Sequence, residues 1–263
     1  AETLRPGLTA RTGAAVLSTL QLIGEAVRLF VAACRQLRFG ATDRQRIVAQ
    51  LVRVGTDTAP IAATLSLFVG MVLVVQSADQ LRNVSQTVLG PIVGLAMTKE
   101  MGPVMMGFLL AGRTGSSIAA ELGSMAVYDE IGALRTMDID PVRFLVVPRL
   151  IASAVSLPVL VLYADFVGIL GGAAVVAVDP AISLSVSEYF TRMLEWVKLG
   201  DVLTGLVKGV AFGIIAALVP CTFGLRTRGG AEGIAGSTTA AVVWSFVWIL
   251  MFDFLIVRLS FAL

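Results

Sequence analysis

Charged side chains in the middle of apolar segments are the residues of this sequence best able to do chemistry. Lys99 and Glu100 stand together inside an apolar run that extends roughly over 88–112. A charge at the centre of a membrane span costs about 2.5–3.5 kcal/mol on insertion scales, so such residues tend to mark a function. Two interpretations stay open. The two residues form a buried ion pair with another helix, or they border a polar cavity and contact a polar headgroup.

Three further ionisable residues, Asp165, Lys208 and Asp253, also stand in apolar segments. Lys208 and Asp253 have opposite charge, which favours an ion pair between two helices, whereas Asp165 has no obvious partner. Elsewhere the sequence has no histidine and no G-x-x-x-x-G-K-[ST] or G-x-S-x-G motif. These absences argue against a histidine base, a common zinc or haem site and ATP hydrolysis by the chain itself. We therefore expect no catalytic residue, metal or cofactor.

The composition indicates an integral membrane protein of the all-α class. Hydrophobic residues make up 57% of the 263 residues and charged residues 14%, with a mean hydropathy of +0.88. Soluble domains contain roughly 25% charged residues. A net charge of +2 is too small to indicate nucleic-acid binding. Cys34 and Cys221 belong to no paired motif and are interpreted as small apolar residues, not as a disulfide.

Hydrophobic segments predict one domain over 1–263 with five membrane-spanning helices. The expected spans run roughly over 59–76, 88–112, 144–176, 202–223 and 238–257. Residues 14–38 have the spacing of an amphipathic helix that lies in the membrane interface, although a first true span that tolerates two charges is the alternative. Residues 179–200 predict a short amphipathic segment at the outer surface.

Arginines set the expected orientation, because loops rich in Lys and Arg stay in the cytoplasm. The segment before the first span and the polar region over 113–140 hold most of the arginines, whereas the opposite loops hold only Arg82, Arg192 and Lys198. We therefore place the N-terminus and this polar region in the cytoplasm, and the C-terminus on the outer side.

The polar region contains a candidate docking segment over 118–138. Apolar residues recur there at helical spacing, which favours one or two short helices over a plain solvated loop. Acidic, apolar and glycine positions together indicate a contact surface for a soluble partner. The residues expected to form this contact are Glu121, Gly123, Met125, Glu130 and Leu134.

The same region resembles the signature of the MlaE/YrbE permease family. The motifs that carry the resemblance are Phe68-Val-Gly70-Met71-Val, Glu100-Met-Gly-Pro-Val, Ala111-Gly-Arg113-Thr-Gly115-Ser, Ala119-Ala-Glu121-Leu-Gly123-Ser-Met125, Glu130-Ile-Gly-Ala-Leu134, Met137-Asp-Ile-Asp140-Pro141 and Val147-Pro148-Arg149. The family usually has Arg-Glu before the Gly-Pro, and Lys99 here keeps the charge but not the guanidinium fork. The arginine bias also resembles the actinobacterial branch, in which two different YrbE subunits pair.

This resemblance implies a permease subunit of an ABC transporter in the bacterial inner membrane, working with Mce-domain lipid-binding proteins. It implies a second permease copy or paralogue, a separate ATPase that uses ATP and docks on a coupling helix at 118–138, and a phospholipid, fatty acid or related lipid as cargo. We expect Val72, Val75 and Gln76, together with Lys99 and Glu100, to line the lipid cavity. The alternative is a non-transporting membrane scaffold that anchors an Mce/ATPase complex. A self-contained secondary transporter would need internal repeats that the sequence lacks.

Overall fold

A computed structural model of the protein describes residues 8–36, 41–81 and 86–260, and this part of the chain is helical without strands. The bounds of the α-helices are α1 Leu8–Arg35, α2 Ala41–Leu51, α3 Ala59–Leu81, α4 Leu89–Ala96, α5 Gly102–Leu110, α6 Ser116–Val127, α7 Glu130–Thr136, α8 Val147–Val178, α9 Val186–Trp196, α10 Leu199–Leu225 and α11 Gly230–Ser260. A short 3₁₀ turn, η2 Gln86–Val88, precedes α4. The all-α fold class is confirmed.

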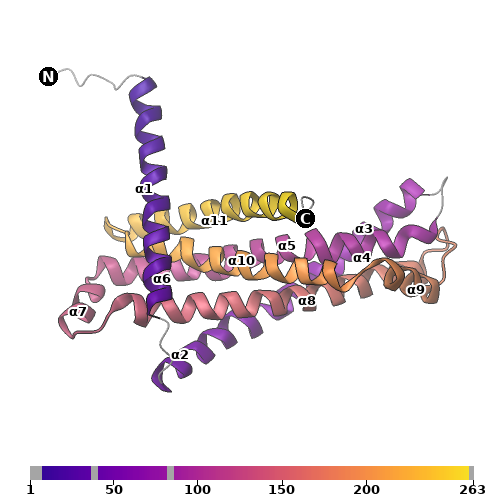
Figure 1. The fold of residues 1–263 in the computed structure, drawn as a ribbon, viewed down its shortest axis with the longest axis horizontal. Helices are drawn as coiled ribbons and strands as arrows, with labels where there is room; N and C mark the ends of the chain where they lie inside the picture. The colour runs from indigo at the N-terminus through magenta and orange to yellow at the C-terminus, as the bar shows by residue number, and fades with distance from the viewer. Residues whose placement is uncertain (1–7, 37–40, 82–85, 261–263) are drawn as a thin grey trace.

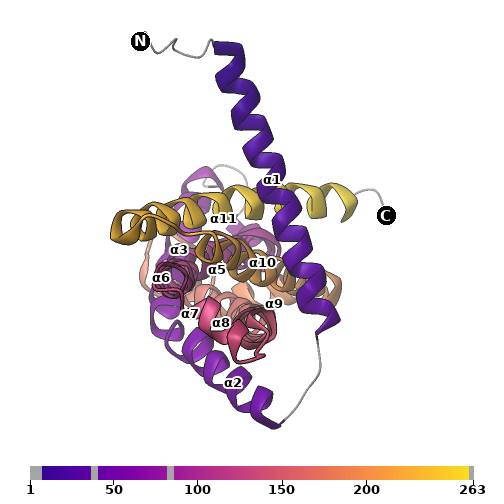
Figure 2. The same cartoon turned by 90° about the vertical axis from the view of Figure 1, so that its left-hand side faces the viewer.

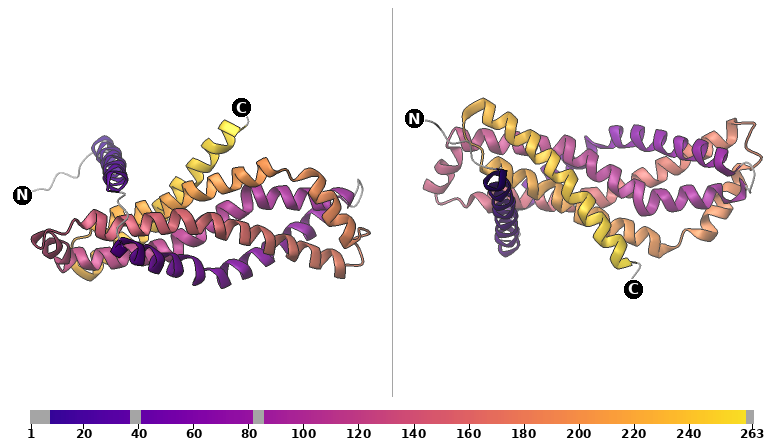
Figure 3. Two further views of the ribbon diagram at one scale, coloured as in Figure 1. Left: turned by 60° about the horizontal axis from the view of Figure 1, so that its bottom comes forward. Right: turned by 90° about the horizontal axis from the view of Figure 1, so that it is seen from above.

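Five stretches of helix are long and apolar enough to cross a membrane. They run over Arg44–Leu81, Gln86–Val127, Val142–Val178, Leu199–Leu225 and Gly230–Ser260. Each contains one of the five expected spans, and most extend beyond it because polar residues at the ends continue the helix. The long helices lie along one axis and form a bundle (Figure 1). Figure 3 shows that the C-terminal part of α11 leaves the bundle.

Single π-helical turns connect several of these helices into longer ones. They are η1 Val52–Thr56, η3 Met97–Met101, η4 Ala111–Gly115 and η5 Val142–Val146. The second spanning helix contains two of them, and η3 holds both Lys99 and Glu100. Such turns are rare inside α-helices and occur frequently at functional sites. At the start of the third spanning helix, Asp140 Oδ1 accepts a hydrogen bond from the Val142 amide at 2.8 Å.

Helix α1 runs across the bundle instead of along it (Figures 1 and 2). It covers Leu8–Arg35, so it begins before the predicted residues 14–38, and positions 37 and 38 lie outside the described residues. Ala33 near its end is buried in a cluster with residues of α6, α7, α8 and α10. Its position in the membrane interface stays a prediction.

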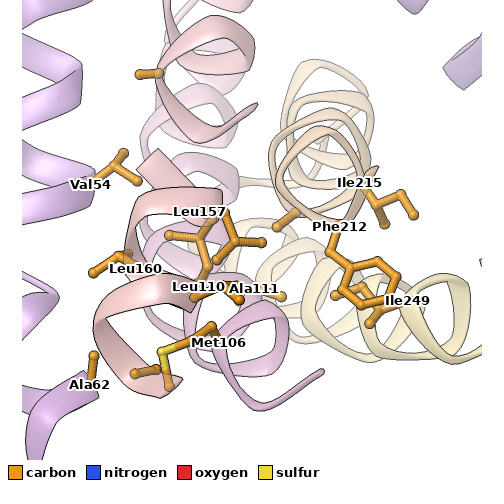
Figure 4. Close-up of a cluster of buried hydrophobic side chains, with 14 of the residues drawn as sticks. Val54, Ala62, Met106, Leu110, Ala111, Leu157, Leu160, Phe212, Ile215 and Ile249 are labelled. Atoms are coloured by element: carbon orange, nitrogen blue, oxygen red, sulfur yellow. The ribbon is translucent and has the colours of Figure 1, made fainter. Parts of the chain in front are cut away.

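Helix α8 is the centre of the bundle and contacts both α3 and α10 closely. A Cβ atom added to Gly70 of α3 would lie 1.8 Å from the carbonyl oxygen of Gly168 in α8. A Cβ atom added to Gly213 of α10 would lie 2.4 Å from the carbonyl oxygen of Ser153. Small residues at such contacts let helix backbones approach in a membrane. Figure 4 shows part of the main core, where Leu157 of α8 lies in one cluster with side chains of η1, α5, α10 and α11.

The two ends of the bundle differ. One end carries the last turns of α6, the short helix α7 and the start of α8, and the other carries α9 with the end of α3 and the start of α4 (Figure 1). The Tyr189 side chain of α9 is fully buried at this second end. The helices α9 and α4 pack closely there, because a Cβ atom on Gly90 would lie 2.2 Å from the Tyr189 carbonyl oxygen. We call these the α7 end and the α9 end.

Candidate functional site

A buried lysine on α10 is the centre of an ion cluster inside the spanning helices. The Nζ atom of Lys208 lies 2.8 Å from Glu100 Oε2 on η3 and 2.8 Å from Asp253 Oδ1 on α11. The Lys208 side chain has no exposed surface. The predicted pairing of Lys208 with Asp253 is therefore confirmed. The geometry is that of a close ion pair without an aligned hydrogen bond, because Asp253 Oδ1 has no hydrogen-bond partner in the described chain.

The third partner of Lys208 comes from the backbone. Its Nζ donates to the carbonyl oxygen of Lys99 at 2.8 Å. In a regular α-helix this carbonyl would accept from residue 103, but Pro103 has no N–H group. The Gly-Pro that follows Glu100 thus leaves a carbonyl for which an ammonium on a neighbouring helix is a suitable donor.

Lys99 forms a separate ion pair with α10. Its Nζ lies 2.8 Å from Oδ1 of Asp201, whose other oxygen accepts from the Lys198 amide at 2.9 Å and caps the helix. The side chains of Lys99 and Glu100 remain 45% and 40% exposed. The two charges thus contact different residues of one helix and still present polar atoms to the surroundings. Contact with a headgroup stays a prediction. Asp201 was not predicted as a partner of Lys99, because in the sequence it looks like an ordinary helix cap.

The three residues of α3 predicted to line the same cavity lie elsewhere in the single chain. Val72 and Val75 are 49% and 52% exposed, and Gln76 is exposed as well. Helix α3 packs mainly on α8. The exposure of these three residues leaves them free to meet lipid or another chain, so their role stays a prediction.

Asp165 in α8 is buried next to the same turn. Its Oδ1 atom has no hydrogen-bond partner among the described residues, in line with the lack of an obvious partner in the sequence. A Cβ atom on Gly102 would lie 1.9 Å from this oxygen. Gly102, the first residue of α5, therefore lets the backbone lie against the Asp165 carboxyl group, and a larger residue would force that group to move.

The predicted docking residues at the α7 end have different environments. Gly123 packs against Thr227, Leu134 is buried, and Met125 is partly buried in the same cluster. Glu121 uses both carboxylate oxygens inside the chain, with Oε1 2.9 Å from Arg149 Nη2 and Oε2 3.4 Å from Arg53 Nη1. Glu130 is exposed. Of the five residues, Glu130 is therefore the one best placed to touch a partner.

Two exposed apolar residues flank α7 and were not singled out in the sequence. Tyr128 is 73% exposed and Met137 is 61% exposed. Asp129 and Asp138, which adjoin them, have φ of 57° and 58°, and this left-handed conformation turns the chain sharply on both sides of α7. Together with Glu130 they form an exposed patch of mixed polarity. In the sequence, the aspartates that follow Tyr128 and Met137 were the signal for sharp turns at these positions, because Asp tolerates the left-handed conformation.

Comparison with known proteins identifies the family. Residues 47–259 match the family model described as Permease MlaE. A probable ABC transporter permease protein of Rickettsia typhi is 38% identical over 216 residues, which cover 82% of this chain and 83% of the relative. The intermembrane phospholipid transport system permease protein MlaE of Haemophilus influenzae is 33% identical, over 82% of this chain and 83% of the relative.

A chloroplast protein is also similar. The protein TRIGALACTOSYLDIACYLGLYCEROL 1 of Arabidopsis thaliana is 33% identical over 82% of this chain and 62% of its own length. The match to the family model includes most or all of each of the five membrane helices. It also includes the cluster around Lys208 and the ion pairs of Glu121. The chain therefore belongs to the MlaE permease family of ABC transporters, and it is a membrane transport subunit and not itself an enzyme.

Proposed function

We propose that this chain moves a phospholipid, fatty acid or related lipid as one permease subunit of a larger ABC complex. Its family membership supports lipid as the cargo, and so does its similarity to the phospholipid transport permease of Haemophilus influenzae. The five spanning helices found in the described residues pack into a bundle whose shared core is filled with buried side chains. A second copy or a paralogue would complete the path, since two chains around an axis can enclose a cavity that one cannot.

The ion cluster around Lys208 is the observation that carries this proposal. Three charged side chains, Lys208, Glu100 and Asp253, are costly to maintain inside apolar helices, and Glu100 and the neighbouring Lys99 are each nearly half exposed. A lipid site needs a mostly apolar wall with a few polar groups that orient the headgroup. Lys99 and Glu100 supply one donor and one acceptor for it, and the exposed apolar residues of α3, including Val72 and Val75, supply a wall for acyl chains. A passive scaffold could use the buried Lys208 to hold its helices together, but it would not need two half-exposed charges beside it.

The exposed patch around Glu130 is the proposed contact for the ATPase, which would use ATP on its own subunit. A helix end that is rigidly packed on one side and exposed on the other can transmit movement of a docked protein to the spans. Leu134 and Ile131 supply the packed side, and Glu130 the exposed side. The α7 end then lies on the cytoplasmic side of a bacterial inner membrane, and Mce-domain proteins contact the α9 end on the opposite side.

The test is purification of the native complex followed by reconstitution. We expect a P-loop ATPase and an Mce-domain protein to co-purify with the chain, and ATP to drive lipid movement between reconstituted vesicles and the Mce protein. A variant ATPase that binds ATP without hydrolysing it serves as control. Co-purification of both partners without ATP-dependent lipid movement would favour the scaffold.

A further inference from the structure

A small polar pocket at the α7 end has no role in the lipid path described above. It lies where α2 and η1 of the first spanning helix meet η4 and α6 of the second, and its volume is about 170 Å³. Arg53, Arg113, Thr114 and Ser117 contribute to its wall, with Asp57 and Glu121 also present. Hydrogen-bond donors thus gather where the spanning helices approach one end of the bundle.

Arg113 is a partly buried cation without a counter-ion. Its Nη1 atom donates to the hydroxyl of Thr58 at 2.8 Å, and it forms no ion pair within the described part of the chain. Glu121 does not neutralise it, because its two oxygens contact Arg149 and Arg53. A guanidinium left in this way attracts an anion, since its planar donors match phosphate and carboxylate.

Thr114 supplies a second, independent sign of a ligand. It is 8% exposed and lines the pocket, and its Oγ1 atom has no hydrogen-bond partner in the described chain. Buried hydroxyl groups are normally satisfied by protein or water. Next to it, Ser117 Oγ accepts from Arg53 Nη2 at 3.2 Å, so its own proton remains to be donated. One guanidinium without an ion pair and two residues with hydroxyl groups therefore line one small space.

We infer that this pocket binds the phosphate group of a phospholipid whose acyl chains stay outside the bundle. Val48 and Val52, which precede Arg53 on α2 and η1, are 56% and 52% exposed and give the chains an apolar surface beside the pocket. The small volume suits a phosphate with part of its glycerol, and it does not suit an acyl chain. This inference rests on the proposed function and specifies that its lipid carries a phosphate, held apart from the cluster at Lys99 and Glu100.

Retention of two matched lipids by the full chain in its purified complex tests the assignment. Native mass spectrometry counts bound dioleoyl phosphatidic acid and dioleoylglycerol, which has the same acyl chains and no phosphate. We expect Arg113→Gln to lower the occupancy of one phosphatidic acid per chain about tenfold, since one charge-assisted hydrogen bond is lost, while lipid held at Lys99 and Glu100 is retained. Thr114→Val lowers it less and Thr114→Ser keeps it. Retention of dioleoylglycerol is the same in all variants, which shows that they are folded.

Arg192→Gln is the matched control, because it removes an exposed arginine at the α9 end that is paired with Glu195. Equal retention of phosphatidic acid in the wild type and Arg113→Gln overturns the assignment and leaves a pocket for water. Displacement of phosphatidic acid by an equal concentration of inorganic phosphate also overturns it, because the ligand would then be a free anion. Lipid movement is measured in the same preparation. A wild-type complex that moves no lipid contradicts the proposed function instead.

Discussion

Two ion clusters connect the spanning helices, and they differ in how many partners surround the buried cation. In the middle of the bundle, Lys208 is fully buried and has two carboxylates and a carbonyl oxygen as partners. At the α7 end, the Arg149 side chain is 5% exposed, but its single carboxylate partner, Glu121, is 41% exposed. The first cation is satisfied inside the protein, whereas the second shares its partner with Arg53 and with solvent.

This difference suggests that the central cluster stabilises the helix packing, whereas the cluster at the α7 end can change its partners. Removing the fully buried Lys208 would leave two carboxylates without a cation, so the central cluster holds three helices together. Glu121 is half exposed and is already shared by two arginines, so it can exchange partners at small cost. The cluster at the α7 end is therefore suited to rearrange when a protein docks beside it. The predictions that follow go from the largest expected effect to the smallest.

Removal of the buried cation should cause the largest loss of stability. Lys208→Met leaves Glu100 and Asp253 facing each other without a cation, which costs about 3–5 kcal/mol. Thermal unfolding in detergent measures the loss. Lys198→Met, at an exposed position before α10, is the matched control, and we expect a change within about 0.5 kcal/mol. Equal unfolding temperatures for the two variants would show that the central cluster does not hold the helices.

Charge reversal at Glu130 should weaken the ATPase contact without unfolding the chain. An acidic contact that is desolvated on docking costs about 2–5 kcal/mol when it is reversed. Glu130→Lys should insert normally and retain less ATPase on co-purification. Glu195→Lys, which reverses an exposed glutamate at the α9 end, should retain it fully. Undiminished association and lipid-dependent ATP hydrolysis in Glu130→Lys would make this segment a plain loop.

The charges at the edge of the central cluster should affect lipid more than assembly. The double variant Lys99→Ala with Glu100→Ala removes one charge of each sign, and Lys208 keeps Asp253. We expect the complex to assemble and hydrolyse ATP, with bound lipid lowered about tenfold, on the order of one charge-assisted hydrogen bond. Native mass spectrometry reads assembly and bound lipid together. Poor assembly would indicate that the pair serves only the fold.

Within the α7-end cluster, the exposed cation should matter little for stability. The Arg53 side chain is 53% exposed and lies 3.4 Å from Glu121, so Arg53→Gln should cost less than about 1 kcal/mol of unfolding free energy. Arg149→Gln should cost more, because its position is buried and Glu121 would lose its closer partner. Thermal unfolding of both variants decides this, and a reversed order would contradict the comparison of the two clusters.

Cysteine labelling tests the orientation with almost no effect on stability. With Cys34 and Cys221 changed to Ser, Tyr128→Cys should be shielded from an impermeant thiol reagent in intact cells and Leu194→Cys should react. Both positions are about equally exposed, at 73% and 70%. Tyr189 would be unsuitable because its side chain is buried. The opposite labelling pattern would place the ATPase contact on the wrong side.

The spans, the fold class and the pairing of Lys208 with Asp253 could be predicted because hydrophobicity and opposite charge are visible in the sequence. The partner of Lys99 could not, since Asp201 is about a hundred residues away and already has a local use as a helix cap. The environments of Gly123 and Leu134 could not be predicted either. A docking segment was expected from their spacing, but the same spacing also packs a helix against its own bundle.

The π turns have a consequence for comparing relatives. Each such turn adds one residue to the helical repeat, which rotates all later side chains by about 100° relative to an uninterrupted α-helix. Between Glu100 and Glu121 the chain passes the end of η3 and the whole of η4. The direction in which Glu121 faces therefore depends on residues that never touch it. Closing Ala111–Gly115 into a regular α-helix without deleting a residue would turn Glu121 away from Arg149, whereas deleting one residue along with the π turn would leave Glu121 facing the same way. Alignments of this family should accordingly be phased by helix face, and a one-residue gap at one of these turns can preserve the direction of all the side chains that follow.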